Sequence, residues 1–355
     1  MDMKKIGIAV AGFLVLAVGI CFAFSGFNKN TANTPAVDKV HRPVRMPANT
    51  ASDIGVAIVA PGSYGQETNG CARGIDALEQ LGFKVFNYYD HSKRYQRFAG
   101  TDENRLRQIN DAVNNPNVDV IMALRGGYGA SRLMSSLNFE RIAKSGKIFV
   151  GHSDTTAIQL ALLKHGTVSF AGPMVCPDYA QADLNAYTMQ HFEEALFSPQ
   201  IRLDWQDKGN PDVNVSGTFW GGNLTMLTSL IGTRYMPDIQ GGILFVEDTH
   251  EHPYHLERML IQLDEAGILR KQKALVLGRF TEYQITPADN GYNLNAMVSW
   301  LRHRLPIPVI TGLPFGHTKN KATLPIGAKA ELVSRGDSVS LKLSDYPHFT
   351  SNSHF

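Results

Sequence analysis

Short apolar runs that alternate with amphipathic segments constrain the fold of this chain more than any other feature. Runs rich in Val and Ile begin at Ile54 and are separated by segments with helical spacing of apolar residues. Strands that are apolar throughout are buried on both faces, and their alternation with helices is typical of a parallel sheet. We therefore expect an α/β fold, with strands at 54–60, 83–89, 118–124 and 147–150 and helices at 71–83, 102–115 and 129–137.

The size and charge of the chain limit what it can bind. Its 355 residues suit about two domains, and a hydrophobic content of 43% can bury substantial cores. The formal net charge is only +2, and no dense stripe of Lys and Arg with interleaved aromatic residues is present in the sequence. These features argue against a nucleic-acid partner and favour a small-molecule or polymer substrate.

The first 53 residues differ in composition from the rest. An uncharged run from Ile6 to Phe24 follows two lysines, which favours a signal peptide or a membrane anchor over residues 1–25. Ala23-Phe24-Ser25 is a candidate cleavage site, and Cys21 leaves a lipid-modified N-terminus open. Residues 26–53 are rich in Asn, Thr and Pro and predict a flexible linker. We expect the rest of the chain to be periplasmic or otherwise extracytoplasmic.

The pattern changes after a polar stretch, and we place a domain boundary near Phe197 to Asp212. The first domain would then span 54–200 and the second 212–346. The second contains a strand end, a Gly-rich turn and a helix within 217–233, apolar strands at 241–248 and 274–280, and a helix that starts at Pro253. Its last part, 323–344, alternates like paired strands around the turn RGD.

The segment GHSDTT, 151–156, places Ser153 where an apolar strand meets a helix. A serine at a helix start is often an N-cap that accepts hydrogen bonds from free backbone N–H groups. The alternative is a nucleophile held on a tight strand-to-helix turn, with backbone N–H groups ready for an oxyanion. The choice between these interpretations depends on whether the second half of the chain supplies catalytic partners for Ser153.

The segment RGGYG, 125–129, also follows a strand, so we expect it to lie close to Ser153. It could simply be a turn that needs glycine dihedral angles. It is not a dinucleotide-binding fingerprint, because Arg132 stands where that motif requires Gly or Ala. The sequence has no Walker A motif either.

Three places in the second half carry reactive groups at the end of a strand or in a loop: Glu247-Asp248, the cluster HEHPYH at 250–255, and PFGHTKNKAT at 314–323. A zinc-binding HExxH motif would need His where Tyr254 stands, and Pro253 interrupts the helix, so we interpret the cluster as a solvated loop without metal. His317 could be a structural histidine with one backbone hydrogen bond. Cys71 and Cys176 allow one disulfide in an oxidising compartment.

Six motifs in a fixed order, RGGYG, GHSDTT, GGNL, ILFVED with LERML, GRF and GLPFGH, give a specific resemblance. Between Ile54 and Ser344 the chain resembles the LD-carboxypeptidase family of serine peptidases, which includes the microcin C immunity peptidases. The resemblance implies an N-terminal domain with a Rossmann-like parallel sheet and a smaller, strand-rich C-terminal domain. It also implies an active site at their interface and a homodimer.

Catalytic roles follow from the resemblance residue by residue. Ser153 matches the nucleophile, Glu247 the acid and His317 the base, and an oxyanion hole is implied at the backbone N–H groups of Gly127 and Asp154. A neighbouring histidine can take the proton that makes serine nucleophilic, and a carboxylate can orient that histidine. The sequence leaves open whether Glu247 rather than Asp248 or Glu251 faces the histidine. His152 departs from the Tyr or Phe that we expect there.

The implied reaction removes the terminal D-Ala from peptidoglycan tetrapeptides at the meso-diaminopimelate–D-Ala bond through an acyl-enzyme, without a cofactor. An exported enzyme would meet the wall itself, which favours wall trimming over antibiotic immunity. A peptidase for a peptidyl-nucleotide and a non-catalytic wall-binding protein remain alternatives, and cleavage of cross-linked peptides stays open. Candidate substrate-binding residues are Arg125, Arg279 and Lys319 for a carboxylate, and Asn223 and Trp220 for the cleft, with a core role open for Trp220.

Overall fold

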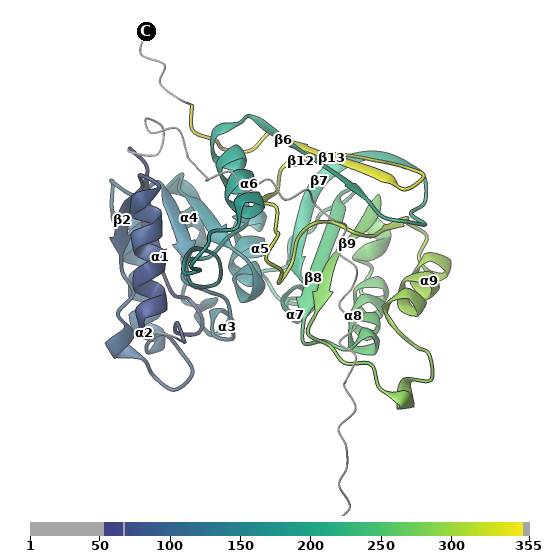
Figure 1. Cartoon of the computed structure of the whole chain (residues 1–355), viewed down its shortest axis with the longest axis horizontal. Helices are drawn as coiled ribbons and strands as arrows, with labels where there is room; N and C mark the ends of the chain where they lie inside the picture. The colour runs from purple at the N-terminus through teal and green to yellow at the C-terminus, as the bar shows by residue number, and fades with distance from the viewer. Residues whose placement is uncertain (1–52, 67, 351–355) are drawn as a thin grey trace, which may run out of the picture. The chain divides into compact units, whose positions relative to one another are not determined.

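Two β-sheets organise the part of the chain that the computed structural model describes, residues 53–66 and 68–350 (Figure 1). All of these residues belong to one compact unit. The expected signal or anchor and the linker up to residue 52 lie outside the described residues. None of the described helices is both long and apolar enough to cross a membrane.

The first sheet has the strand order β11-β5-β4-β3-β1-β2. Its strands run parallel except for β11, which pairs antiparallel with β5. The strands are β1 (Gly55–Val59), β2 (Lys84–Asn87), β3 (Val120–Ala123), β4 (Ile148–Gly151), β5 (Ser169–Ala171) and β11 (Leu324–Ile326).

Helices follow the parallel strands of this sheet, as the alternating pattern predicts, and the last of them, α6, leads into the second sheet. They are α1 (Thr68–Gln80), α2 (Asp102–Asn114), α3 (Ala130–Leu133), α4 (Phe139–Lys144), α5 (Thr156–Lys164) and α6 (Ala186–Phe197), with the short helices η1 (His91–Lys93), η2 (Ser153–Thr155) and η3 (Val175–Tyr179, a π-helix). The start of α2 follows the ordinary capping rule, since the Thr101 side chain accepts from the Asn104 N–H there.

The second sheet is mixed, with the order β10-β9-β8-β7-β12-β13-β6. Its strands are β6 (Gln200–Gln206), β7 (Val213–Asn223), β8 (Ile243–Thr249), β9 (Ala274–Thr281), β10 (Val309–Ile310), β12 (Lys329–Arg335) and β13 (Ser338–Ser344). Helices α7 (Leu224–Ser229), α8 (Pro253–Glu265) and α9 (Leu294–Arg304) and the short helices η4 (Leu269–Lys271) and η5 (Pro287–Asp289) belong to the same half of the chain.

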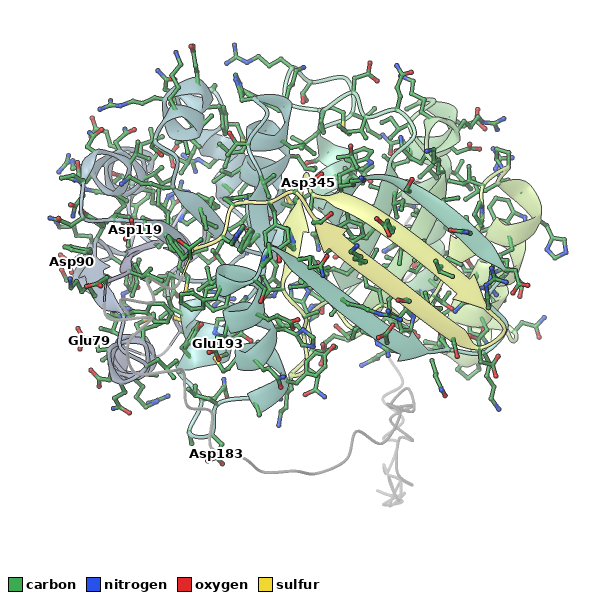
Figure 2. The ribbon with its side chains drawn as sticks, turned by 90° about the horizontal axis from the view of Figure 1, so that it is seen from above. Glu79, Asp90, Asp119, Asp183, Glu193 and Asp345 are labelled. Carbon is green, nitrogen blue, oxygen red and sulfur yellow. The ribbon has the colours of Figure 1, made fainter. Side chains whose placement is uncertain are left out.

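Strand β7 joins the parallel and antiparallel parts of this sheet. Residues 213–218 pair antiparallel with β12, whereas 219–223 pair parallel with β8. Gly221 allows the close approach of the neighbouring strand, because a Cβ there would lie 1.9 Å from the Phe245 carbonyl oxygen. Figure 2, which looks from above, shows β12 and β13 in yellow beside teal β6.

The predicted α/β fold class, with a parallel sheet followed by a strand-rich half, is confirmed. The expected strand pair in 323–344 is present as β12 and β13, which are antiparallel. Two features differ from the sequence interpretation. The stretch 198–212 contains β6, which pairs with β13. Strand β11 belongs to the second half of the sequence but pairs with β5 of the first sheet. The proposed domain limits, 54–200 and 212–346, stay a prediction.

Candidate active site

Ser153 lies on a sharp turn between β4 and α5. Its backbone φ is +62°, in the left-handed region that disfavours a residue with a side chain. The hydroxyl lies 3.5 Å from Asp154 Oδ2, and no side-chain cap is present at the start of η2 or of α5. The N-cap interpretation of Ser153 is therefore wrong, and the strained strand-to-helix turn matches the geometry of a nucleophile elbow.

The segment 125–129 packs against this turn. A Cβ at Gly126 would lie 2.6 Å from Ser153 Cβ, so only glycine lets the two loops come this close. Gly127 has a φ of +87°, and a Cβ there would lie 2.4 Å from Ser63 Oγ. The glycines thus serve both as a turn and as a close approach to Ser153.

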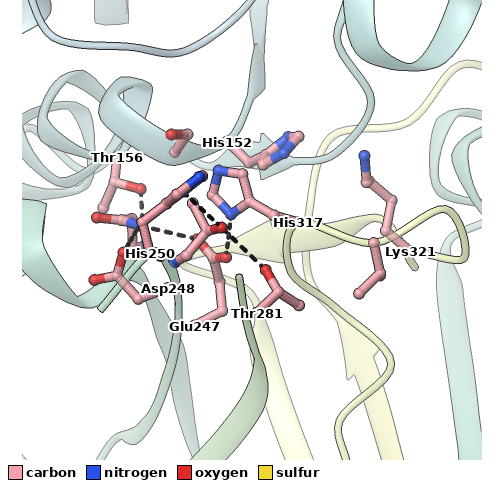
Figure 3. Close-up of polar contacts among 12 residues, drawn as sticks. His152, Thr156, Glu247, Asp248, His250, Thr281, His317 and Lys321 are labelled. Atoms are coloured by element: carbon pink, nitrogen blue, oxygen red, sulfur yellow. Dashed lines mark hydrogen bonds and ion pairs between the residues drawn. The ribbon is translucent and has the colours of Figure 1, made fainter. Parts of the chain in front are cut away.

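Glu247 and His317 form a contact across 70 residues of sequence. His317 Nδ1 lies 2.7 Å from Glu247 Oε2, and the Glu247 side chain is fully buried (Figure 3). Burial lowers the pKa of His317, but the hydrogen bond and the charge of Glu247 outweigh it and raise that pKa above its ordinary 6.5. The contact fixes Nδ1 toward the carboxylate and leaves Nε2 as the nitrogen for a reacting group.

The position of Glu247 in its strand explains why it can face His317. The pairing of β8 with β9 shifts register between Val246 and Asp248, so that two residues of β9, Gly278 and Arg279, lie opposite Glu247 in a β-bulge. Bulges re-aim side chains, and they are frequent beside active sites. On the other side of β8, Glu247 pairs with Asn223 of β7, whose Nδ2 lies 3.3 Å from Glu247 Oε1.

The neighbouring carboxylates are engaged elsewhere. Asp248 accepts hydrogen bonds from Asn223 Nδ2 and from the N–H and hydroxyl of Thr225. Burial and the charge of Glu247 raise the pKa of Asp248. Glu251 Oε2 lies 2.8 Å from His255 Nδ1. Glu247 is therefore the carboxylate that contacts His317, which the sequence left open.

His152 lies beside His317, with ring centroids 5.1 Å apart. Its side chain is buried, and its Nδ1 lies 3.0 Å from the Gly172 carbonyl oxygen, to which it donates. Burial, with the nearby cation of Lys321 and the charge of His317, holds the pKa of His152 well below its ordinary value. The ring is thus a neutral wall of the site.

A buried ion pair holds the His317 loop against the first half of the chain. Lys321 Nζ lies 2.5 Å from Asp178 Oδ1, and the two side chains are only 4% and 6% exposed. Asp178 belongs to η3, and its other oxygen accepts from the Met174 N–H. Sequence reasoning missed this pair, because no local pattern links two residues that are 143 positions apart.

The predicted substrate-binding residues differ in their burial and in their contacts. Arg125 is half-buried and its Nη1 lies 3.5 Å from the Tyr64 carbonyl oxygen. Arg279 lies beside the His317 loop, where its N–H donates to the Phe315 carbonyl. Lys319 is exposed. Trp220 does not line a cleft: its side chain is fully buried and Nε1 donates to Gln272 Oε1, so the core alternative holds.

The histidine cluster at 250–255 is a surface feature of the α8 start. His252 is the N-cap of α8, and its Nε2 lies 3.2 Å from Asp289 Oδ1. Among the described residues, no group of three or more His, Cys, Asp or Glu side chains is arranged to hold a metal ion.

A serine on a strained strand-to-helix turn and a Glu–His pair are features that serine hydrolases share. The LD-carboxypeptidase N-terminal domain matches residues 56–172, and the C-terminal domain of that family matches residues 216–332. The chain belongs to the LD-carboxypeptidase family, a family of serine peptidases.

Three relatives illustrate the similarity. The crystal structure of muramoyltetrapeptide carboxypeptidase from Oxalobacter formigenes is 57% identical, with a TM-score of 0.80 over 82% of this chain and 99% of that one. The murein tetrapeptide carboxypeptidase of Pseudomonas aeruginosa is 30% identical over 84% of this chain and 96% of its own. The microcin C7 self-immunity protein of Escherichia coli is 27% identical over 72% and 83%.

Proposed function

We propose that this protein is a serine L,D-carboxypeptidase that removes the terminal D-Ala from tetrapeptide stems of peptidoglycan or muropeptides. The bond cut joins the L-centre of meso-diaminopimelate to D-Ala. The observation that carries the proposal is the strained turn at Ser153, whose neighbour His152 has its ring centroid 5.1 Å from that of His317, the partner of buried Glu247. Relatives named for muramoyl or murein tetrapeptides support the substrate class.

In the first step, Ser153 Oγ attacks the diaminopimelate carbonyl carbon while His317 Nε2 takes the hydroxyl proton. Glu247 stabilises the resulting imidazolium through its 2.7 Å contact with Nδ1. The carbon–nitrogen bond then breaks, and His317 returns the proton to the leaving amine of D-Ala. A water molecule, deprotonated by His317, attacks the acyl-enzyme and releases the tripeptide.

The oxyanion of each tetrahedral intermediate needs donors that point at it before the reaction begins. Asp154 lies in the first turn of the helical segment that starts at Ser153, where backbone N–H groups have no partner within the helix. Gly127, with its positive φ, supplies the second N–H from the loop that touches Ser153. Each such donor contributes about 3 kcal/mol to transition-state stabilisation.

Specificity requires recognition of the free carboxylate beyond the cut bond. Because His317 protonates the leaving amine, the D-Ala carboxylate must lie on the His317 side of the site. Arg279 is the candidate that fits this position best: a Cβ at Gly316 would lie 3.1 Å from Arg279 Cβ, and Gly316 precedes His317. Replacing Arg279 by Leu should raise KM more than it lowers kcat.

The test is incubation of the purified full chain with disaccharide-tetrapeptide, followed by mass spectrometry, with Ser153→Ala alongside. Wild type should release one alanine, and Ser153→Ala should release none while keeping its circular dichroism spectrum. Ser135→Ala, which changes an exposed serine after α3, is the matched control and should act as wild type. Full activity of Ser153→Ala would contradict the serine mechanism, and cleavage of a peptidyl-nucleotide alone would favour an immunity peptidase.

The place of action is also part of the proposal. The uncharged run from Ile6 to Phe24 would export the domain, where it meets the cell wall. Cell fractionation should recover the domain outside the cytoplasmic membrane, and recovery only in the cytosol would contradict export. A homodimer stays a prediction, which light scattering can check.

A further inference from the structure

Two cysteines far apart in sequence lie in direct contact in the first half of the structure. Cys71 of α1 and Cys176 of η3 have sulfur atoms 3.1 Å apart, across 105 residues of sequence. A disulfide bond has a length of about 2.05 Å, so a movement of about 1 Å would bring the sulfur atoms to bonding distance. Both thiols are free in the structure.

The two segments that carry these thiols are packed closely. A Cβ at Gly74 of α1 would lie 2.7 Å from Val175 Cγ1 of η3, so the absence of a side chain at Gly74 allows the contact. Cys71 is buried, with 5% of its surface exposed, whereas Cys176 is half-buried. A reagent from solvent can therefore reach Cys176 first.

Segment η3 also contacts both loops of the proposed active site. The Cys176 N–H donates to the Leu124 carbonyl oxygen at 2.9 Å, directly before the glycine loop that touches Ser153. Two residues further on, Asp178 forms the buried ion pair with Lys321 of the His317 loop. A restraint on η3 therefore acts on the glycine loop beside Ser153 and on the His317 loop at the same time.

The surroundings of the pair favour thiol chemistry. The hydrogen bond from the Cys176 thiol lowers the pKa of Cys71 against the opposing effect of burial, and the charge of Arg125 lowers it further. A thiolate is the form of cysteine that attacks a disulfide. Donation of that hydrogen bond, with burial, raises the pKa of Cys176.

We propose that Cys71 and Cys176 are an oxidation site at which a small-molecule or protein disulfide joins α1 covalently to η3. Cys176, the thiol that solvent reaches first, loses its proton to the Cys71 sulfur or to the buffer, and its thiolate attacks one sulfur of the oxidant, which forms a mixed disulfide and expels the first thiolate. The Cys71 thiolate then attacks the Cys176 sulfur and expels the second. Two cysteine thiols are oxidised, the oxidant is reduced to two thiols, and the cysteine protons pass to the departing thiolates or to the buffer.

The bond closes a long loop, so it removes many conformations from the unfolded chain and stabilises the folded one. For a loop of this length in a protein of this size, we expect the melting midpoint to rise by roughly 5 to 10 °C. Because η3 contacts both active-site loops, the temperature at which activity is lost should rise by a similar amount.

The experiment uses the full chain carrying Cys21→Ser, so that only the pair can react. The reduced protein is incubated with glutathione disulfide, and intact mass and peptide mapping follow the products. We expect a loss of two hydrogens, a linked pair of peptides containing Cys71 and Cys176, and the higher melting midpoint. Two free thiols after incubation, or a persistent glutathione adduct on Cys176 without the link, would overturn the proposal.

Cys71→Ser in the same background is the matched control. Its Cys176 should retain one glutathione, because the resolving thiol is absent, and its melting midpoint should not rise on oxidation. If this variant does not fold, the mass measurement on the chain with both cysteines still decides the question. The readout needs no turnover, so it is independent of the proposed peptidase function.

Discussion

Ser153 and His317 stand in loops of opposite halves of the chain, and these loops acquire their shape in different ways. The Ser153 loop is shaped by its own backbone: a positive φ at the serine and a glycine, Gly126, that lets a second loop touch it. The His317 loop is shaped by side chains from distant segments, namely Glu247 through its contact with Nδ1 and Asp178 through Lys321. The difference teaches that the nucleophile side depends on steric fit, whereas the base side depends on electrostatic contacts.

The largest effect should come from Glu247→Gln on the base side. The amide keeps the shape but cannot stabilise the imidazolium, so we expect kcat to fall by about 1,000- to 10,000-fold. Asp248→Asn is the matched control, because Asp248 contacts Asn223 and Thr225 instead of His317. It should keep kcat within about tenfold. Steady-state kinetics on a tetrapeptide substrate measure both, and equal losses would contradict the distinction between the two carboxylates.

On the nucleophile side, Gly126→Ala tests steric fit. The new methyl group would lie 2.6 Å from Ser153 Cβ, so one loop must move. A displacement of about 1 Å in such a site can cost about 100-fold in rate, and we expect a loss of kcat of that order. Gly146→Ala is the control: its Cβ meets no atom within 4 Å, although the φ of +71° adds strain. Wild-type kinetics for Gly126→Ala would show that the close approach is dispensable.

Lys321→Met tests the ion pair that holds the base-side loop. It leaves the buried Asp178 carboxylate without its cation, and such a loss costs about 3–5 kcal/mol of unfolding free energy. Replacing both residues, Lys321→Met with Asp178→Leu, removes the uncompensated charge and should recover most of that loss. Urea unfolding measures all three proteins. A single variant as stable as wild type would mean that the pair does not stabilise the loop.

The smallest expected effect is on the pH dependence of kcat/KM. His317 must be neutral to accept the serine proton, so kcat/KM should fall as pH drops through its raised pKa. In Glu247→Gln the hydrogen bond and charge that raise this pKa are lost, so the acidic limb of the residual activity should move to lower pH. If the acidic limb does not move, the fall in activity at low pH reports the titration of a group other than His317.

The same raised pKa predicts a pH dependence of stability. Protonated His317 is favoured in the folded state, so its contribution is fully present below the unfolded pKa of about 6.5 and is lost as pH rises through the folded pKa. The difference in unfolding free energy between wild type and Glu247→Gln should therefore shrink as pH rises across that window. A difference that grows with pH would contradict the assignment.

Much of the fold and the candidate site could be predicted from sequence, because the signals are local. The run before Ser153 and the run before Glu247 each end in a polar residue at the C-terminal end of a strand, which is where a parallel sheet gathers its functional groups. The role of Trp220 was undecidable from sequence, since an aromatic residue beside a glycine turn fits either a cleft or a core. The sequence interpretation treats 198–212 as a polar boundary between domains and so misses β6, although the alternation of polar and apolar residues in Gln200–Gln206 is itself a strand signal.

The sequence by itself determined the alternation of strands and helices, the glycines of segment 125–129 and the residue types of the site, because these follow from periodicity and from backbone sterics. Only the tertiary structure decided that Glu247 faces His317, that Lys321 pairs with Asp178, and that Cys71 meets Cys176. The physical reason is that a contact between residues 70 to 143 positions apart depends on how distant elements pack, and for Glu247 also on the register shift between β8 and β9. A shift of one residue in register turns every side chain of a strand to the opposite face, and no local pattern records it.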